Sequence, residues 1–453
     1  MRSPVLTLLI ASTFAVAACS SSGETATSTS DAAATATATT EPAVDSTVEP
    51  PATTGAPVDT EAPLAPFEVL PPGPYAVGVK TITIDADSER PLTVDVWFPI
   101  DDAGDAAPHE YRFLPGLVDV SDNAVDAEPT AMSADGPFPF VVYSHGSGGF
   151  RYVASDYTEA IASYGYIVAS ADHTGNTALD DLLCTRATGP VTALNRVNDV
   201  ETVIDAMLDP QSTESAGFVA NVDAERIAVT GHSLGGFTAF AAVTGYENEL
   251  GSVAADDRID AIIPLAPAIG GDRPPLDEST ATTTNPDRVD PCATAADPAT
   301  PPLTPEEIEA ARNRKSITDD QLASITVPAM VIVGTDDLST PVEPNVTRAW
   351  EFGGSEPFYR VELIAGQHQS FSNACHYFLD LLPTWTPDLQ TLTRPLLESQ
   401  AAQGCGDGIM DIRRAQDLTN TFAITFLDSI FRGEAMIDPA TTAIPDDVIF
   451  MSK

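Results

Sequence analysis

The sequence is short of lysine and rich in acidic residues. Only Lys80, Lys315 and Lys453 are present among 453 residues, and 21 Lys and Arg stand against 66 Asp and Glu, which gives a net charge of −45. A protein that grips a phosphate backbone needs clustered Lys and Arg. Docking on anionic lipid through a polybasic patch needs the same residues. The composition therefore argues against a nucleic-acid partner and against membrane binding by surface charge.

Long apolar runs and metal-binding motifs are also missing. After the first 18 residues no segment offers 18 uninterrupted apolar residues, so we expect no transmembrane helix. The six histidines are scattered, and no H-x-x-x-H, C-x-x-C or G-x-x-x-x-G-K pattern occurs. We therefore expect no metal and no cofactor.

The N-terminus has the pattern of an export signal. Arg2 precedes Val5–Val16, an apolar stretch too short to span a bilayer and of the right length for a signal peptide. The stretch ends at Val16-Ala17-Ala18-Cys19, which resembles a bacterial lipobox. We predict a lipoprotein signal peptide over residues 1–18 and lipidation of Cys19, with an anchor at the outer face of the cell membrane. The alternative is an ordinary signal peptide with Cys19 incidental.

A low-complexity segment follows over residues 19–66. It is almost entirely Ser, Thr, Ala, Pro, Glu and Asp, without any Lys, Arg or aromatic residue. Such a segment buries too little apolar surface to offset its ordering entropy, so we predict a disordered tether with a reach of roughly 35–40 Å. The remaining body, residues 67–453, carries a net charge of −39. We predict one domain there, and a monomer.

Cysteine usage agrees with export. Four cysteines lie in the body: Cys184, Cys292, Cys375 and Cys405. An even number outside the cytoplasm indicates two disulfides, with three possible pairings. We favour Cys375–Cys405 and Cys184–Cys292, and free buried thiols are the alternative.

Strand and helix patterns alternate along the body. This alternation predicts the α/β class, with a mostly parallel sheet, an N-terminal antiparallel hairpin and helices on both faces. We expect an irregular acidic stretch over 101–137 and two excursions, at 269–320 and 370–412, that supply pocket walls. A capping box at Thr304 predicts a helix inside the first excursion. The expected strands are Val77–Ala86, Pro91–Ile100, Phe138–Ser144, Tyr166–Ala171, Arg226–Thr230, Ile259–Leu265, Ala329–Val333 and Arg360–Ile364; the expected helices are Tyr152–Tyr164, Ala193–Leu208, Leu234–Val243 and Ala415–Phe431.

A nucleophile elbow stands between one expected strand and one expected helix. The motif is Gly231-His232-Ser233-Leu234-Gly235. A G-x-S-x-G turn in strand–turn–helix context exposes its serine on a sharp turn, above the N-terminus of a helix that stabilises negative charge. We predict that Ser233 is the nucleophile, against the alternative of a plain glycine-rich turn.

An oxyanion hole needs a second backbone donor, from the loop after the third core strand. That loop is His145-Gly146-Ser147-Gly148-Gly149. We predict the N–H groups of Leu234 and Ser147 as donors, with Gly148 as the alternative to Ser147. We expect a structural role for His145, because the base should follow the acid in the chain.

The acid and the base follow later strands. Gly334-Thr335-Asp336-Asp337 comes at one strand end, so Asp337 is the first choice for the acid and Asp336 the second. His368 follows the last expected strand and is the predicted base, with His376 the only late competitor. In this hypothesis His368 takes the proton of Ser233 and Asp337 fixes the imidazole tautomer.

Taken together, these motifs resemble bacterial α/β-hydrolases grouped with platelet-activating-factor acetylhydrolases and dienelactone-hydrolase-like esterases. The resemblance implies an α/β-hydrolase fold and ester hydrolysis over most of residues 73–372. One position departs from the acetylhydrolases, which carry the acid after the sixth strand, where this chain has none. The matching stretches are Gly73–Val79, Val96–Pro99, Tyr143–Gly146, Asp172–Thr177, Gly231–Gly236 and His368–Phe371.

The sequence therefore predicts an exported serine hydrolase that cleaves small carboxylic esters through an acyl-enzyme. Acetylated phospholipids and polyesters are the next substrates in order, and a non-catalytic ligand-binding lipoprotein or an inactive scaffold are the alternative functions. We expect short acyl groups to be preferred, with no activation at a lipid interface, because the acidic body repels anionic surfaces. The expected partners are a small-molecule ester and, through the lipid anchor only, the membrane.

Overall fold

The structure, a computed structural model, describes residues 64–114, 117–271 and 315–453. These residues belong to one compact unit that spans Ala62–Lys453. The predicted signal peptide, the lipidated Cys19, nearly all of the tether, the helix predicted after Thr304, and Cys292 with its predicted bond to Cys184 lie outside the described residues. These features therefore remain predictions.

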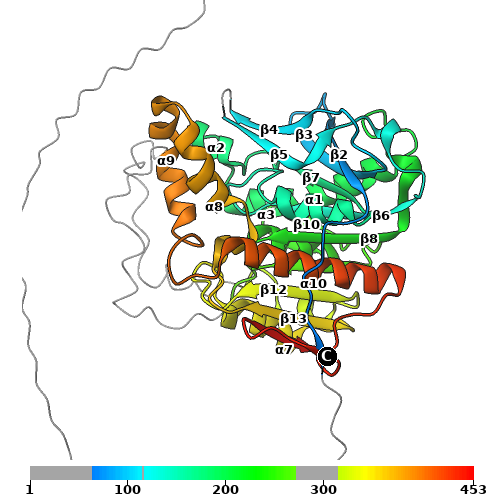
Figure 1. Ribbon diagram of the computed structural model, residues 1–453, viewed down its shortest axis with the longest axis vertical. Helices are drawn as coiled ribbons and strands as arrows, with labels where there is room; N and C mark the ends of the chain where they lie inside the picture. The colour runs from blue at the N-terminus through cyan, green and yellow to red at the C-terminus, as the bar shows by residue number, and fades with distance from the viewer. Residues whose placement is uncertain (1–63, 115–116, 272–314) are drawn as a thin grey trace, which may run out of the picture. The chain divides into compact units, whose positions relative to one another are not determined.

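A sheet of 11 strands forms the centre of the described part, as the strand–helix alternation predicted (Figure 1). Its order is β15-β13-β12-β11-β8-β6-β7-β3-β2-β5-β4, and the six strands from β13 to β7 run parallel. They are fully buried apart from a few terminal residues, so they appear in the sequence as continuous apolar runs. Their bounds are β6 Phe138–Ser144, β7 Ile167–Ala171, β8 Val222–His232, β11 Ala261–Leu265, β12 Ala329–Gly334 and β13 Phe358–Leu363.

The predicted N-terminal hairpin is present as β2 (Ala76–Ile84) and β3 (Leu92–Ile100), which pair antiparallel. The expectation of an irregular stretch over 101–137 is wrong, because β4 (Pro108–Leu114) and β5 (Leu117–Asp126) extend the sheet there. Two register shifts interrupt their pairing, and many exposed positions are acidic. Both features hide the period-two pattern from which a strand is predicted.

A further strand closes the opposite edge. The sequence made Arg360–Ile364 the last strand, but β15 (Val448–Ser452) pairs antiparallel with β13. The short strands β1 and β14 pair with each other, and so do β9 and β10. Their bounds are β1 Ala65–Pro66, β14 Thr442–Ala443, β9 Tyr246–Asn248 and β10 Gly251–Val253.

Helices pack in two groups against the sheet. One group pairs α1 with α10, and Figure 1 shows α10 lying across the near face; the other runs from α3 through α4 and α6 to α7. The remaining helices are α2, α8 and α9, of which α8 and α9 contact each other. The bounds are α1 Ser155–Ser163, α2 Ala178–Leu183, α3 Gly189–Leu208, α4 Leu234–Thr244, α6 Asp319–Ala323, α7 Arg348–Phe352, α8 Ala374–His376, α9 Pro387–Ala401 and α10 Ile412–Arg432.

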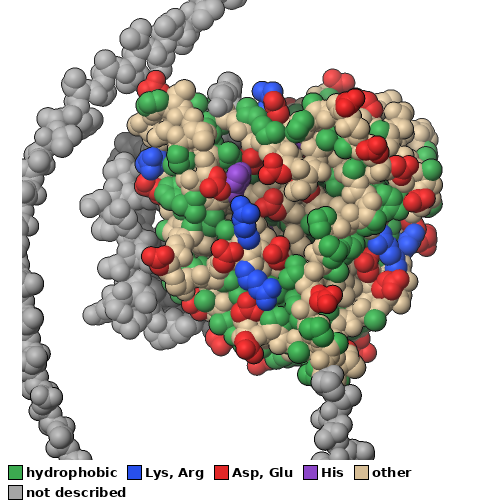
Figure 2. All heavy atoms as spheres, in the orientation of Figure 1, with side chains coloured by type: hydrophobic (Ala, Val, Ile, Leu, Met, Phe, Trp, Pro, Cys, Tyr) green, Lys and Arg blue, Asp and Glu red, His purple; other side chains and the backbone are tan. Residues whose placement is uncertain are grey.

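The surface carries the negative charge that the composition implied. Figure 2 shows acidic side chains spread over the visible face, with few Lys or Arg among them. Within the described ranges, no helix has the length and apolar character needed to cross a membrane.

Candidate active site

The nucleophile elbow has the geometry that its motif requires. Strand β8 ends at His232 and α4 begins at Leu234, so Ser233 occupies the turn between them with φ 59°. That φ is strained for a residue with a side chain. A Cβ atom on Gly235 would come within 1.8 Å of the carbonyl oxygen of Ser144, and one on Gly231 within 2.5 Å of the same oxygen. Both flanking glycines are therefore required by close backbone approach.

The base reaches the nucleophile from the turn after β13. Nε2 of His368 lies 2.9 Å from Oγ of Ser233. The backbone carbonyl of His368 accepts a hydrogen bond from Nε2 of His232 at 2.8 Å. Burial, and then the nearby His368, lower the pKa of His232 to about 3, so His232 stays neutral and keeps one ring nitrogen as the donor. The residue before the nucleophile thus fixes the loop that carries the base.

The acid comes from the turn after β12. Oδ2 of Asp337 lies 2.8 Å from Nδ1 of His368, and Oδ1 accepts the backbone N–H groups of Ser339 and Thr340, each at 2.8 Å. Burial alone would raise the pKa of Asp337, but the hydrogen bond and charge of His368 and the Thr340 donors outweigh it and hold that pKa below its usual value. Asp337 is therefore a carboxylate that orients the imidazole.

The two alternatives from the sequence lie elsewhere. Asp336 is exposed, and its carboxylate accepts a hydrogen bond from Thr335 Oγ1. His376 forms ion pairs with Asp119 and Asp380. The structure thus brings together the first choices, Ser233, Asp337 and His368, and leaves the second choices out.

One of the two predicted oxyanion donors lines the cavity, and the other directly follows the nucleophile in the chain. Ser147 and Ser233 line one cavity, and Leu234 is the first residue of α4. Among the described residues, the backbone N–H groups of Ser147 and Leu234 have no acceptor, whereas the N–H of Gly148 donates to the carbonyl of Asn176 at 3.3 Å. The free N–H of Ser147 favours it over Gly148 as the second donor.

A second Ser–His–Asp set occurs behind the first. Oγ of Ser144 lies 2.8 Å from Nε2 of His173, whose Nδ1 lies 2.8 Å from Oδ2 of Asp199. All three residues are at most 2% exposed, and Ser144 does not border the cavity that Ser233 lines. Burial, followed by the charge of Arg196, lowers the pKa of His173 to about 4, so its imidazole stays neutral. This set is sealed from substrate and is structural.

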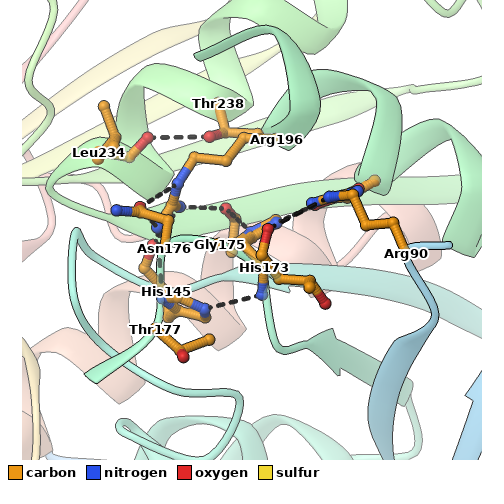
Figure 3. Close-up of polar contacts among 12 residues, drawn as sticks. Arg90, His145, His173, Gly175, Asn176, Thr177, Arg196, Leu234 and Thr238 are labelled. Carbon is orange, nitrogen blue, oxygen red and sulfur yellow. Dashed lines mark hydrogen bonds and ion pairs between the residues drawn. The ribbon is translucent and has the colours of Figure 1, made fainter. Parts of the chain in front are cut away.

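Two charged residues of this buried network were not predicted from the sequence. Arg196 and Asp199 lie three positions apart on α3, both buried, beside Val200 and Val203. A charged pair on the apolar face of a helix is the signal that would have found them. Figure 3 shows Arg196 reaching toward Asn176 and the His145 loop, with Arg90 and His173 beside them. His145 is buried within this network, consistent with the structural role expected for it.

The cavity at Ser233 has a volume of about 270 Å³ and an aromatic wall. The ring centroids of Phe150 and Tyr152 lie 4.6 Å apart, and those of Tyr111 and Tyr152 lie 5.0 Å apart. Tyr111 donates a hydrogen bond to Glu159 at 2.6 Å, which fixes its ring in the wall. Tyr111 belongs to β4, so it was hidden by the wrong expectation for residues 101–137.

One contiguous segment supplies a further part of the cavity lining. The structure joins Cys375 and Cys405 in a disulfide, as the sequence analysis favoured. The segment between them is bonded to the residue after the base, because Gln369 donates its backbone N–H to Gln403 at 2.8 Å and its side-chain amide to Gln400 at 2.5 Å. The cavity-lining residues within the segment are Tyr377, Leu381, Trp385, Thr393, Leu397, Gln400 and Gln403.

Removing this disulfide should weaken both the fold and substrate binding. A closed loop with a sequence separation of 30 contributes about 3–4 kcal/mol by the chain-entropy relation. The double variant Cys375→Ser/Cys405→Ser should lose stability of that order in denaturant unfolding and show a raised KM, because the wall loosens. A reductant should remove the difference between the wild type and the double variant, because neither then has the Cys375–Cys405 bond. Unchanged KM and stability would contradict the prediction.

His376 should make stability depend on pH. Its hydrogen bond to Asp119, and the further bond to Asp380, raise its pKa to about 9 from an unfolded value near 6.5. Asp156 also faces it. Because the folded pKa is raised, the contribution is fully present below about pH 6.5 and lost as pH rises through about 9.

The variant His376→Gln should therefore lower the melting temperature at pH 6 and have little effect at pH 9.5. Arg394→Gln is the matched control, since its ion pair with Glu398 lies on α9 and contains no histidine. A loss that is equal at both pH values would contradict the prediction.

One stretch of the chain matches the model of a known protein family. The family model described as platelet-activating factor acetylhydrolase, isoform II, matches residues 116–192, from β5 through the oxyanion loop to the start of α3. The chain has an α/β-hydrolase fold, and the matched stretch is similar to this acetylhydrolase family. The resemblance and the fold class expected from the motifs are confirmed.

One solved structure similar to this chain is a ferulic acid esterase from Streptomyces cinnamoneus. It is 22% identical with a TM-score of 0.53, and the match covers 85% of this chain and 98% of that one. The search of curated proteins finds no match. Within the described ranges, no group of three or more His, Cys, Asp or Glu residues in this chain is placed to hold a metal ion.

Proposed function

We propose that the protein hydrolyses carboxylic esters with Ser233 as nucleophile, His368 as general base and Asp337 as the orienting acid. The observation that carries this proposal is the continuous chain of contacts, 2.9 Å from Ser233 to His368 and 2.8 Å from His368 to Asp337, opening into a cavity. The buried set of Ser144, His173 and Asp199 has the same residue types, but its serine does not border the cavity.

The mechanism follows from that geometry. Oγ of Ser233 attacks the ester carbonyl while Nε2 of His368 takes its proton, and the N–H groups of Ser147 and Leu234 bind the oxyanion. His368 then protonates the departing alcohol. Water attacks the acyl-enzyme with His368 again as base, which releases the acid and restores the Ser233 hydroxyl.

A fluorophosphonate probe tests the proposal directly. Mass spectrometry of the labelled wild-type protein should place the adduct on Ser233 and leave the peptide that carries Ser144 unmodified. Heat-denatured protein should not label. An adduct on any other serine would overturn the assignment.

For the substrate we propose short acyl esters, with acetylated phospholipids and polyesters behind them. The volume of about 270 Å³ limits how long an acyl chain can be enclosed. On p-nitrophenyl esters, kcat/KM should peak between acetyl and hexanoyl and fall at dodecanoyl, because a filled pocket rejects added length. A rise that continues to palmitoyl, or a jump above the critical micelle concentration, would contradict this proposal.

One observation favours a second substrate class, aromatic esters. Five aromatic residues line the cavity, and stacking against such rings stabilises an aryl group. The structural neighbour is itself named a ferulic acid esterase. Methyl cinnamate hydrolysed with a higher kcat/KM than methyl hexanoate would support this class, and the reverse would exclude it. The residues are Tyr111, Phe150, Tyr152, Tyr377 and Trp385.

We also propose that the enzyme acts outside the cell, tethered by a lipid on Cys19. The lipobox-like residues and the acidic, low-complexity segment that follows support this location. Mass spectrometry should find a diacylglyceryl group on Cys19, and Cys19→Ala should move the enzyme from the membrane fraction to the medium. An unmodified mature N-terminus would contradict the proposal.

A further inference from the structure

Three hydrogen-bond donors converge on one backbone carbonyl beside the nucleophile. The oxygen of Gly146 receives Nη2 of Arg196 at 2.9 Å, Nδ1 of His145 at 2.7 Å and the N–H of Gly149 at 3.1 Å. His145 donates from Nδ1 because its Nε2 accepts the backbone N–H of His173 at 3.2 Å. Because a carbonyl oxygen has two lone pairs, three donors use its full capacity to accept hydrogen bonds and restrain the peptide that carries it.

The carbonyl of Gly146 shares its peptide unit with the N–H of Ser147. In a planar trans peptide the C=O and N–H groups point in opposite directions. Donors that hold the carbonyl on one side therefore aim the N–H of Ser147 to the other side. A Cβ on Gly146 would lie 3.4 Å from Cβ of Ser233, so the loop is packed directly against the nucleophile. The orientation of this peptide decides whether the oxyanion meets an N–H or a carbonyl.

Arg196 holds the loop at more than one point. Its guanidinium is fully buried, and it also donates to the carbonyl of His145 at 2.6 Å and to Oδ1 of Asn176 at 2.9 and 2.7 Å (Figure 3). The carbonyl of Asn176 in turn accepts the N–H of Gly148. Loop residues on both sides of Ser147 are thus tied to one side chain.

The charge of Arg196 acts on the same peptide. Within the described part of the chain, the acceptors of its guanidinium are neutral oxygen atoms, and no carboxylate forms an ion pair with it. A cation on a carbonyl draws electron density from the peptide and strengthens its N–H as a donor. The hydrogen bonds continue from Arg196 to Ser144, from Ser144 to His173 and from His173 to Asp199. The buried set therefore helps to fix the position of the guanidinium.

We propose that Arg196 is a positioning residue of the oxyanion hole, which acts through the peptide between Gly146 and Ser147. This inference rests on the proposed function. Arg196 orients and polarises the N–H that stabilises the oxyanion, and it never touches substrate. The interaction strengthens as charge develops on the substrate oxygen, so it lowers the barrier without tightening substrate binding.

Replacing Arg196 by Met, which keeps the length and removes the donors, tests the inference. The kcat of Arg196→Met should fall roughly 10–100-fold, part of the 10²–10³-fold that loss of a whole oxyanion donor costs, with KM changed less than about twofold. The inhibition constant of an alkyl trifluoromethyl ketone should rise by the same factor, because its hemiketal oxyanion occupies the same hole. A folded Arg196→Met with normal kcat, or with a change in KM alone, would overturn the inference.

Arg348→Met is the matched control. Arg348 is also buried and donates to two backbone carbonyls, those of Gly270 and Ile317, away from the cavity. It should lose stability while kcat and the ketone inhibition constant stay within about twofold. An equal loss of kcat in Arg348→Met would show a general effect of removing a buried arginine, and would overturn the inference.

A second variant covers the case in which Arg196→Met does not fold. Arg196→Lys keeps the charge, but one ammonium group cannot reproduce the fork that serves His145, Gly146 and Asn176. Its kcat and ketone affinity should fall together by a smaller factor, and an unchanged kcat would refute the role. Fluorophosphonate labelling distinguishes a failure of this inference from a failure of the proposed function. If Ser233 is labelled and kcat is normal in the Arg196 variants, this inference alone is rejected.

Discussion

Replacing Ser233 with alanine should lower kcat by about 10⁶-fold, because the attacking oxygen is lost and the three residues act as a unit. His368→Ala should cost a similar factor, and the double variant should cost little more than either single one. This non-additivity follows from the single hydrogen-bonded chain, since the base has no proton to take once the nucleophile is gone. Steady-state kinetics on a p-nitrophenyl ester measure the effect.

His376→Ala is the control for the base. It is the other histidine after the elbow, and its ring pairs with Asp119 and Asp380 rather than with Ser233. Its kcat should stay within a few-fold of the wild-type value at neutral pH. Residual activity of a percent or more in Ser233→Ala would refute the nucleophile assignment.

The variant Asp337→Asn should lose about 10⁴-fold in kcat. The remaining carbonyl oxygen would keep the N–H groups of Ser339 and Thr340, which leaves the amide NH₂ facing Nδ1 of His368. The imidazole would then carry its proton on Nε2, toward Ser233, and could not accept another. The loss should appear in kcat with little change in KM.

Asp336→Asn provides the matched comparison. The two residues are neighbours with the same carboxylate, but Asp336 is exposed, and among the described residues its carboxylate hydrogen-bonds to Thr335 alone. Its kcat should remain within about twofold of wild type. Equal losses in the two variants would mean that the charge of the loop, and not the imidazole tautomer, is what matters.

The predictable parts of this molecule are those with a local signature. The elbow at Ser233 combines an apolar strand, two glycines and an apolar helix within a short stretch, so its serine could be placed from the sequence. Asp337 and His368 each follow a buried strand, and parallel strands bring such ends to one edge of a sheet. Choosing Asp337 over Asp336 depended only on position after the strand, and the structure places Asp337 beside His368.

The missed parts depend on partners far along the chain. The acceptors of Arg196 lie 20 to 52 residues away, and no local pattern around Arg196 identifies them. Strands β4 and β5 were missed because register shifts and acidic residues mask their alternation. Tyr111 was lost with them, and so was the aromatic character of one side of the pocket.

The wall between Cys375 and Cys405 has a consequence for engineering. The nucleophile, the loop of Ser147, Asp337 and His368 all precede this segment, so part of the pocket's shape lies on a stretch of chain separate from the reacting groups. Exchanging residues 376–399 for a segment of different sequence, with the cysteines, Gln400 and Gln403 kept, would change which esters fit and leave the reacting groups in place. The enzyme is therefore suited to chimeras and to libraries confined to one cassette.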